Sequence, residues 1–307
     1  MRVQHARDSH ADGAAPPTPY VACPPPHVKA FPEYLRRAGY WCTNNEKTDY
    51  QFVDFNTTDP KSVWDEHSKQ AHWRSRPDPD MPFFSVFNPT VTHESGMWPK
   101  DDDDPSTWPV APEDVIVPPY LVDDEATRTA IAKQYRNLKL ADEQLGDRLR
   151  ELEEDGLTEN TLVMLWSDHG EGLPRKKRWP LDSGTHVPLI AKWPGKIGAG
   201  GRSEHVVTTL DLAATVLMAA RVPIPTHLQS QPIFDITGQD MPARPAVFSH
   251  RDRHDESYDQ IRSVRTDRYR YIRHAEPGTS RLIFSPYRNR HPAMRSLMQA
   301  AAKGELS

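Results

Sequence analysis

The stretch that most constrains the fold of this chain is an apolar run at residues 161–166, followed at once by Ser167, Asp168, His169 and Gly170. A run of bulky and β-branched apolar residues that ends in polar residues and glycine predicts a buried strand. In open α/β sheets the functional side chains gather beyond the carboxyl ends of the strands. The loop after this strand is therefore the first candidate for a functional site.

The strand at 161–166 stands in an alternation of helical and strand-like segments. Apolar residues recur at helical spacing among charged residues from 123 to 154, which predicts a long helix with one packed face. We expect further strands at 82–87 and 187–193 and a further helix at 209–220. This alternation is typical of the α/β fold class.

Composition along the chain predicts three parts. Residues 1–27 are polar and rich in proline, so we expect a loop. Residues 28–240 would form the α/β domain, and residues 241–307 a small α+β subdomain at the C-terminal end. Short alternating segments, typical of a small antiparallel sheet, lie at 246–249, 261–265 and 269–273.

The composition excludes several classes of protein. A net charge of −5 gives no overall basic surface for nucleic acid. No apolar stretch approaches the roughly 20 residues that span a bilayer, so we expect no membrane segment. The two cysteines provide neither a disulfide framework nor a paired zinc motif. The first residues lack the apolar core of a secretory signal, which predicts a cytoplasmic protein as the chain stands, or a periplasmic or secreted one if a segment precedes Met1. No pattern predicts an oligomeric state.

Asp168 and His169 are candidate metal ligands. Adjacent carboxylate and imidazole groups at a strand end can bind a divalent cation, although an ordinary surface loop can have the same composition. Oxygen ligands suit calcium, whereas an imidazole ligand suits transition metals better. The sequence therefore predicts a divalent metal at this loop and leaves the ion open.

A basic cluster and further signals follow the candidate loop. The cluster, at 175–178, contains Lys177, and it precedes Leu-Asp-Ser-Gly-Thr-His-Val-Pro at 181–188, an apolar strand and then Trp-Pro-Gly. This order resembles the second signature region of the sulfatase family, within the alkaline-phosphatase superfamily. The resemblance runs from about Pro24 to about Tyr287 and is greatest to bacterial heparan-N-sulfatase-like and arylsulfatase members. It implies a mixed, mostly parallel sheet flanked by helices.

The resemblance also implies a function. Sulfatases hydrolyse sulfate esters or sulfamates of small molecules or sugars, with a metal ion (calcium, by this likeness) and a formylglycine nucleophile. In this interpretation Asp168 and His169 bind the metal. Lys177 and Lys47 contact the anionic oxygens of the sulfate group, and His93 contacts the sulfate or its leaving group. The transition state spreads negative charge over oxygens, so fixed positive charge stabilises it.

Lys47 and His93 take these roles from the resemblance alone. Lys47 follows an expected amphipathic helix at 31–40 and His93 follows an expected strand, but either could be an ordinary surface residue. Asp49 stands where the family often has a histidine, and His169 stands where many members have asparagine. The second departure leaves a phosphonate or phosphodiester hydrolase of the same superfamily, with Mn2+ or Zn2+, as the alternative.

Two groups of charged residues are interpreted as solvated surface. Arg175 and Arg178 lie on either side of the candidate Lys177, and a solvated loop explains both. The four consecutive aspartates at 101–104 are also typical of a solvated loop.

The family's nucleophile motif, Cys/Ser-x-Pro-x-Arg, does not occur in this sequence. The nearest match begins at Cys23 and has His27 where arginine belongs, and its consecutive prolines do not suit a helix start. No pair of aspartates follows an apolar strand in the first hundred residues. We therefore expect a truncated sulfatase with little activity of its own. The alternative is a catalytically inactive relative that binds a metal or an anion.

Overall fold

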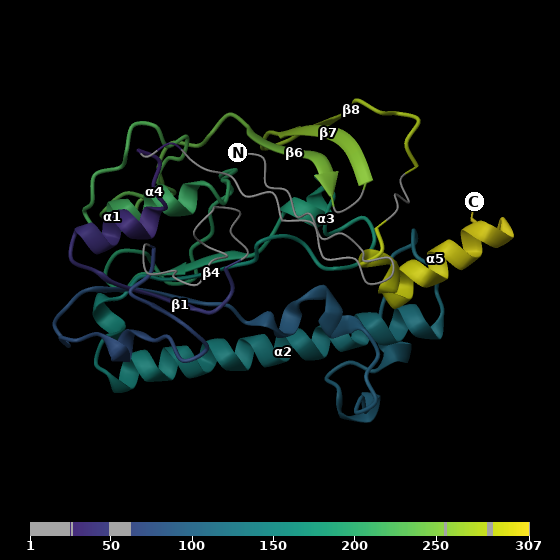
Figure 1. Ribbon diagram of the computed structural model, residues 1–307, viewed down its shortest axis with the longest axis horizontal. Coiled ribbons are helices and arrows are strands. Elements are labelled where there is room, and N and C mark those ends of the chain that lie inside the picture. Colours follow the sequence, from purple (N-terminus) through teal and green to yellow (C-terminus); the bar gives the residue numbers. More distant parts are fainter. Residues whose placement is uncertain (1–24, 26, 49–62, 255–256, 281–284, 307) are drawn as a thin grey trace. The chain divides into compact units, whose positions relative to one another are not determined.

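The structure is a computed structural model that describes residue 25 and residues 27–48, 63–254, 257–280 and 285–306 (Figure 1). The chain divides into two compact units. The first unit comprises Met1–Asn88, Lys192–Val247 and Thr266–Arg268, and the second comprises Pro89–Ala191, Phe248–Arg265 and Tyr269–Ser307. The three parts expected from the sequence stay a prediction, and residues 1–24 of the expected N-terminal loop lie outside the described residues. None of the described helices is both long and apolar enough to cross a membrane.

A parallel sheet lies in the first unit. Strand β1 (Trp41–Asn45) pairs with β2 (Glu66–His67) on one side and with β3 (Phe83–Phe87) on the other. Helix α1 (Phe31–Arg37) contacts β1 and α4 (Asp211–Ala219). The structure confirms the strand expected at 82–87 and the helices expected at 31–40 and 209–220.

The apolar core of this unit explains why those segments fold as they do. Leu35 of α1, Cys42 of β1 and Leu217 of α4 are fully buried in one cluster. Strand β1 was not expected from the sequence, because its Thr43 and Asn44 are polar although both are buried. The Thr43 hydroxyl donates to the Ser85 hydroxyl of β3 at 2.8 Å, which satisfies it inside the sheet.

The second unit is built on a long helix. Helix α2 (Glu125–Glu154) begins after Asp124, whose carboxylate accepts a hydrogen bond from the Thr127 amide at 2.8 Å. Helix α5 (Pro292–Lys303) packs against α2 and ends at Gly304, which has a left-handed conformation (Figure 1). Met97, Ile131 of α2 and Leu297 of α5 belong to their shared core. The structure confirms the helix expected at 123–154, whereas α5 was not expected.

The remaining strands form two small sheets. Strands β4 (Val163–Trp166) and β5 (Leu189–Lys192) pair with each other, as expected for 161–166 and 187–193. Strand β7 (Ser257–Arg265) lies between β6 (Val247–His254) and β8 (Arg270–His274), and β7 and β8 are antiparallel. This confirms the antiparallel sheet expected near the C-terminal end.

Short helical turns complete the described chain. Helix α3 (Asp182–Thr185) follows the loop after β4. Single 3-10 turns lie at Trp73–Ser75, Thr90–Thr92, Glu94–Met97, Pro105–Thr107, Pro112–Asp114, Thr158–Asn160 and Arg288–Arg290. Together, the helices and the parallel and antiparallel strands give the mixed α/β fold that the sequence predicts.

Candidate active site

The loop after β4, residues 167–181, carries three of the five residues that the sequence singles out, and we call it the β4 loop. Its fold requires glycine at Gly170, because a Cβ there would overlap the carbonyl of Ser183 in α3. The Gly170 amide donates to the Gly184 carbonyl at 3.0 Å, which ties the start of the loop to α3. The glycines of the sequence motif therefore allow two backbone segments to approach closely.

Asp168 and His169 lie side by side at the start of the β4 loop. The His169 Nε2 atom is 3.5 Å from the Asp168 Oδ2 atom, and its Nδ1 atom is 2.8 Å from the Gly170 carbonyl oxygen. The Asp168 carboxylate is largely exposed. The Ser167 hydroxyl donates to the His169 carbonyl at 2.6 Å and fixes the turn.

Two ligands do not make a metal site. Calcium takes six to eight oxygen ligands, and zinc takes four ligands. Within the described residues, no group of three or more His, Cys, Asp or Glu side chains is arranged to hold a metal ion. The described residues therefore do not fit a complete metal centre, and the assignment of Asp168 and His169 as ligands stays a prediction.

A buried ion cluster lies at the other end of the β4 loop. Glu94 accepts two hydrogen bonds from Arg178, at 2.6 Å from Nη1 to Oε2 and at 2.8 Å from Nη2 to Oε1. The Lys177 Nζ atom is 3.6 Å from the same Oε2 atom. The interpretation of Arg178 as a solvated residue is wrong, because its side chain is 4% exposed and pairs with a carboxylate that is 1% exposed.

Burial and the neighbouring positive charges have opposite effects on the pKa of Glu94. Burial alone would raise the pKa of Glu94, but hydrogen bonds from Arg178, together with the charges of Arg178, Lys177 and His93, lower that pKa below its ordinary value. Glu94 is therefore a carboxylate at neutral pH. Glu94 thus forms a cluster with two basic side chains, Arg178 and Lys177.

The turn Glu94–Met97 places His93 beside this cluster. The His93 Nδ1 atom is 2.8 Å from the Ser95 hydroxyl, and its ring centre lies 6.1 Å from the ring centre of Tyr287. Gly172 of the β4 loop allows the close approach, because a Cβ there would overlap the Cβ of Glu94. Two of the residues predicted to contact the substrate, His93 and Lys177, are thus brought to one carboxylate.

Lys47 belongs to the first unit and follows β1. Its carbonyl accepts a hydrogen bond from the Asn44 side-chain amide at 2.9 Å. Its predicted contact with the sulfate group stays a prediction, and Asp49, which stands at the neighbouring family position, lies outside the described residues. Cys42 is buried, and burial raises the pKa of its thiol, so it is not a reactive thiolate.

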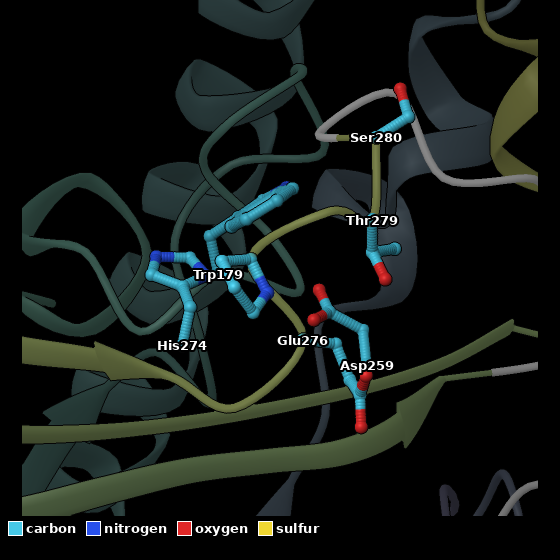
Figure 2. A pocket seen from close by; sticks show the side chains of 7 residues that line it. Trp179, Asp259, His274, Glu276, Thr279 and Ser280 are labelled. Atoms are coloured by element: carbon cyan, nitrogen blue, oxygen red, sulfur yellow. The ribbon is translucent and has the colours of Figure 1, made fainter.

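The second unit also contains a small pocket, and one of its lining residues, Trp179, directly follows Arg178 in the sequence. Its volume is about 110 Å³, and Figure 2 shows its lining side chains: Trp179, Asp259, His274, Glu276, Thr279 and Ser280. The guanidinium of Arg251 lies 4.0 Å from the centre of the Trp179 ring and pairs with Asp259. Arg251 also donates to the Arg178 carbonyl at 2.9 Å, which joins the antiparallel sheet to the β4 loop.

Comparison with protein families defines the class of this protein. Residues 5–222 match the family model Sulfatase, and residues 170–289 match the model N-sulphoglucosamine sulphohydrolase, C-terminal. The chain belongs to the sulfatase family. This confirms the resemblance seen in the β4 loop and the segment after it.

Individual relatives agree with that assignment. The chain is 36% identical to an Ulvan-active sulfatase of Formosa agariphila over 94% of this chain and 52% of that protein. It is 30% identical to human N-sulphoglucosamine sulphohydrolase over 58% of this chain and 37% of that protein. In fold it is similar to a putative sulfatase from Bacteroides thetaiotaomicron, with a TM-score of 0.60 and 18% identity over 92% of this chain and 76% of that one. The chain spans about half or less of the length of the curated relatives it matches.

Glu94 is the member of the buried ion cluster that sequence reasoning missed. Its partner Arg178 is 84 positions away, so no local pattern connects the two. A sequence signal did exist: a glycine at 172, beside the basic cluster, marks a place where another segment approaches the backbone.

Proposed function

We propose that this protein acts in the hydrolysis of sulfate esters or sulfamates carried by a sugar or another small molecule. One observation carries the proposal: in a chain of the sulfatase family, Lys177 and the turn that follows His93 meet at a buried carboxylate whose charge Arg178 already balances. Basic side chains gathered in one place suit a sulfate group, whose transition state spreads negative charge over its oxygens.

Each basic residue has a defined part in this proposal. Lys177 places its ammonium against the anionic oxygens as a point charge, and by family likeness Lys47 has the same role. His93 donates a hydrogen bond to the sulfate group or to the leaving oxygen or nitrogen. Because these charges are held by the fold before the substrate arrives, they stabilise the transition state without reorganisation.

The proposal also includes a divalent metal ion and a formylglycine nucleophile. Asp168 and His169 supply two ligands of a divalent cation, calcium by family likeness, which would neutralise charge on the sulfate oxygens when bound. The remaining ligands and the formylglycine nucleophile would come from residues other than those that the structure describes. The activity of the whole protein is thus proposed from the family, and the chain alone is expected to bind the anion and turn it over poorly.

The pocket beside Trp179 suits the part of the substrate that carries the sulfate. The carboxylate of Glu276 and the hydroxyl groups of Thr279 and Ser280 line it, and such groups form hydrogen bonds with sugar hydroxyls (Figure 2). The name of one relative, N-sulphoglucosamine sulphohydrolase, describes a sulfated sugar as that protein's substrate. We therefore propose a sulfated sugar as the substrate class.

Anion binding by Lys177 tests this proposal directly. Isothermal titration of the purified chain with sodium sulfate should show binding that Lys177→Met weakens about tenfold, the effect of one charge-assisted contact. Lys176→Met is the matched control, because Lys176 is adjacent but pairs with the exposed Glu171 at 2.7 Å. Equal binding by the wild type and Lys177→Met, or equal weakening by both variants, would contradict the proposal.

The imidazole of His169 supports one alternative, a phosphonate or phosphodiester hydrolase that uses a transition metal. Titrations with phenyl phosphonate in the presence of Mn2+, and with sulfate in the presence of Ca2+, separate the two. Tighter binding of the phosphonate with manganese, lost in His169→Asn, would favour the alternative. Tighter binding of sulfate, unchanged in His169→Asn, would favour the sulfatase reading.

A further inference from the structure

The antiparallel sheet of β6, β7 and β8 (Figure 1) has one packed face and one exposed face. Asp259, Ile261 and Ser263 of β7 are buried, and successive residues of a strand point to opposite faces of a sheet. Tyr258 and Arg262 therefore lie on the other face, which we call the outer face. Both are exposed, so the described residues leave this face open.

The pairing of β7 with β8 places further side chains on the outer face. Arg273 is opposite Arg262, and Tyr271 is opposite Val264. Directly opposite residues of an antiparallel pair lie on the same face. Arg273 and Tyr271 are both exposed, which agrees with this placement.

Strand β6 adds another aromatic ring to the outer face. Its Arg251 is buried and pairs with the buried Asp259, so Phe248, three positions before Arg251, points to the opposite side. The outer face thus carries three exposed aromatic side chains, of which 78%, 50% and 64% are accessible: Phe248, Tyr258 and Tyr271. Exposed aromatic side chains gathered on one face are typical of an interaction surface.

Two arginines lie opposite each other on the outer face. Like charges on directly opposite residues destabilise an antiparallel pair. Arg262 forms an ion pair with Asp252 at 2.6 Å, so its charge is balanced within the sheet. The exposed Arg273 guanidinium forms no ion pair or hydrogen bond with any residue that the structure describes. An anion bound to Arg273 would offset the repulsion, and the guanidinium fork suits the oxygens of a tetrahedral anion.

The aromatic rings and the unpaired cation follow one another along the strands. Tyr258 is six positions before Val264, the residue opposite Tyr271. At about 3.3 Å per residue, the two tyrosine positions are about 20 Å apart along the strand direction. Arg273 stands between them, opposite Arg262. A linear sulfated glycan offers the matching groups, because its sugar rings have apolar faces and its sulfate groups lie between them.

A protein partner fits the outer face less well. The central part of a protein–protein interface is depleted of charged residues, whereas here Arg262 and Arg273 stand between the two tyrosines. Aromatic rings separated by charged groups instead suit a chain in which ring faces and anionic groups alternate.

We propose that the outer face of this sheet binds a sulfated glycan chain, with Tyr258 and Tyr271 stacked on sugar rings and Arg273 in contact with a sulfate group between them. The choice of a sulfated glycan rests on the proposed function, whereas the contacts involve none of the residues assigned to the candidate active site. Binding here raises the local concentration of a polymeric substrate.

Binding of dextran sulfate, a sulfated glucose polymer, tests the inference in the 307-residue chain. The wild type should bind it at least about tenfold more tightly than unsulfated dextran or inorganic polyphosphate. Arg273→Gln should weaken this binding about tenfold, and Tyr271→Ala about three- to tenfold. The matched controls, Arg295→Gln on α5 and Tyr135→Ala on α2, change exposed residues of the same types and should bind like the wild type.

Each alternative gives a different result. A wild type that binds no dextran sulfate would overturn the inference, and so would equal losses in Arg273→Gln and Arg295→Gln, which would show an effect of net charge alone. Equal binding of dextran sulfate and polyphosphate, unchanged in Tyr271→Ala, would indicate an anion site without sugar contacts and contradict it too. A dimer that Tyr271→Ala dissociates, without polymer binding, would assign the face to a second copy of the chain. Substitutions at exposed positions are expected to leave the fold intact.

Lys177→Met separates this inference from the proposed function. Its affinity for dextran sulfate should stay close to that of the wild type, because the outer face is unchanged. If the wild type bound no free sulfate but Arg273→Gln still lost dextran sulfate binding, the proposed function would fail and the outer face would keep its role. Loss of dextran sulfate binding in Lys177→Met but not in Arg273→Gln would refute that role.

Discussion

The imidazole of His291 is buried in the second unit, and its Nδ1 atom accepts a hydrogen bond from the Ala293 amide at 3.2 Å, at the start of α5. Burial lowers its pKa from 6.5 to about 4, with Glu94 opposing and Arg178 assisting the change. The unfolded chain therefore binds more protons than the folded chain between these two values. By linkage, the free energy of unfolding must fall as the pH falls from about 6.5 towards 4.

From the size of this pKa difference, we expect the titration of His291 to lower the free energy of unfolding by about 2 kcal/mol as the pH falls from 7 to 5. Urea unfolding at the two pH values measures it. His291→Asn keeps an acceptor at the N-cap of α5 and removes the titrating group, so its stability should change less over the same interval. A variant that loses as much stability as the wild type would show that other groups cause the pH dependence.

At the scale of elements, α2 is joined to the loop before it by a buried lysine. Lys133 is 1% exposed, and its ammonium donates to the Trp98 carbonyl at 2.7 Å and to the Asp103 carboxylate at 2.5 Å. The run of aspartates at 101–104 was expected to be solvated, and for Asp103 this is wrong, because the carboxylate is the partner of a buried cation. The contact holds this loop against α2.

Lys133→Ala should therefore destabilise the second unit by about 3 kcal/mol or more, because it leaves a carbonyl and a carboxylate without their buried donor. Lys139→Ala is the control on the same helix, since Lys139 is exposed and pairs with Glu143 on the surface. It should change the free energy of unfolding by less than about 0.5 kcal/mol. Chemical denaturation at neutral pH compares the two, and similar losses would contradict the assignment.

Elements with a clear apolar pattern were predictable from the sequence, and elements stabilised by distant contacts were not. The strands at 82–87 and 161–166 and helix α2 were found because their apolar residues are concentrated or periodic. Strand β1 was missed because its buried Thr43 and Asn44 depend on partners supplied by β3 and nearby loops. Helix α5 was missed although its first turn begins with a proline, a position that proline favours.

At the scale of the whole molecule, the candidate residues of the β4 loop were predictable from the sequence, whereas the pairing of Glu94 with Arg178 was not. Asp168, His169 and Lys177 follow one another within ten residues, so a family pattern found them, and family membership is confirmed. Glu94 and Arg178 pair because the fold brings together positions that are 84 residues apart, and no local sequence pattern shows this. Charge alone misled the interpretation of Arg178, because sequence does not show which cation of a basic cluster will find a buried carboxylate.

The predicted metal site is incomplete within the described residues. The described residues offer Asp168 and His169 and no third side chain of a metal-binding type beside them, and the chain matches about half of its first relative. Stabilisation by a ligand depends on the ratio of its concentration to its dissociation constant, so a weak two-ligand site gives little. We expect 1 mM calcium to raise the unfolding temperature of this chain by less than about 2 °C. Scanning fluorimetry with calcium or a chelator measures this, with Asp168→Asn as the control. A larger rise in the wild type that Asp168→Asn abolishes would show that further residues of these 307 complete the site.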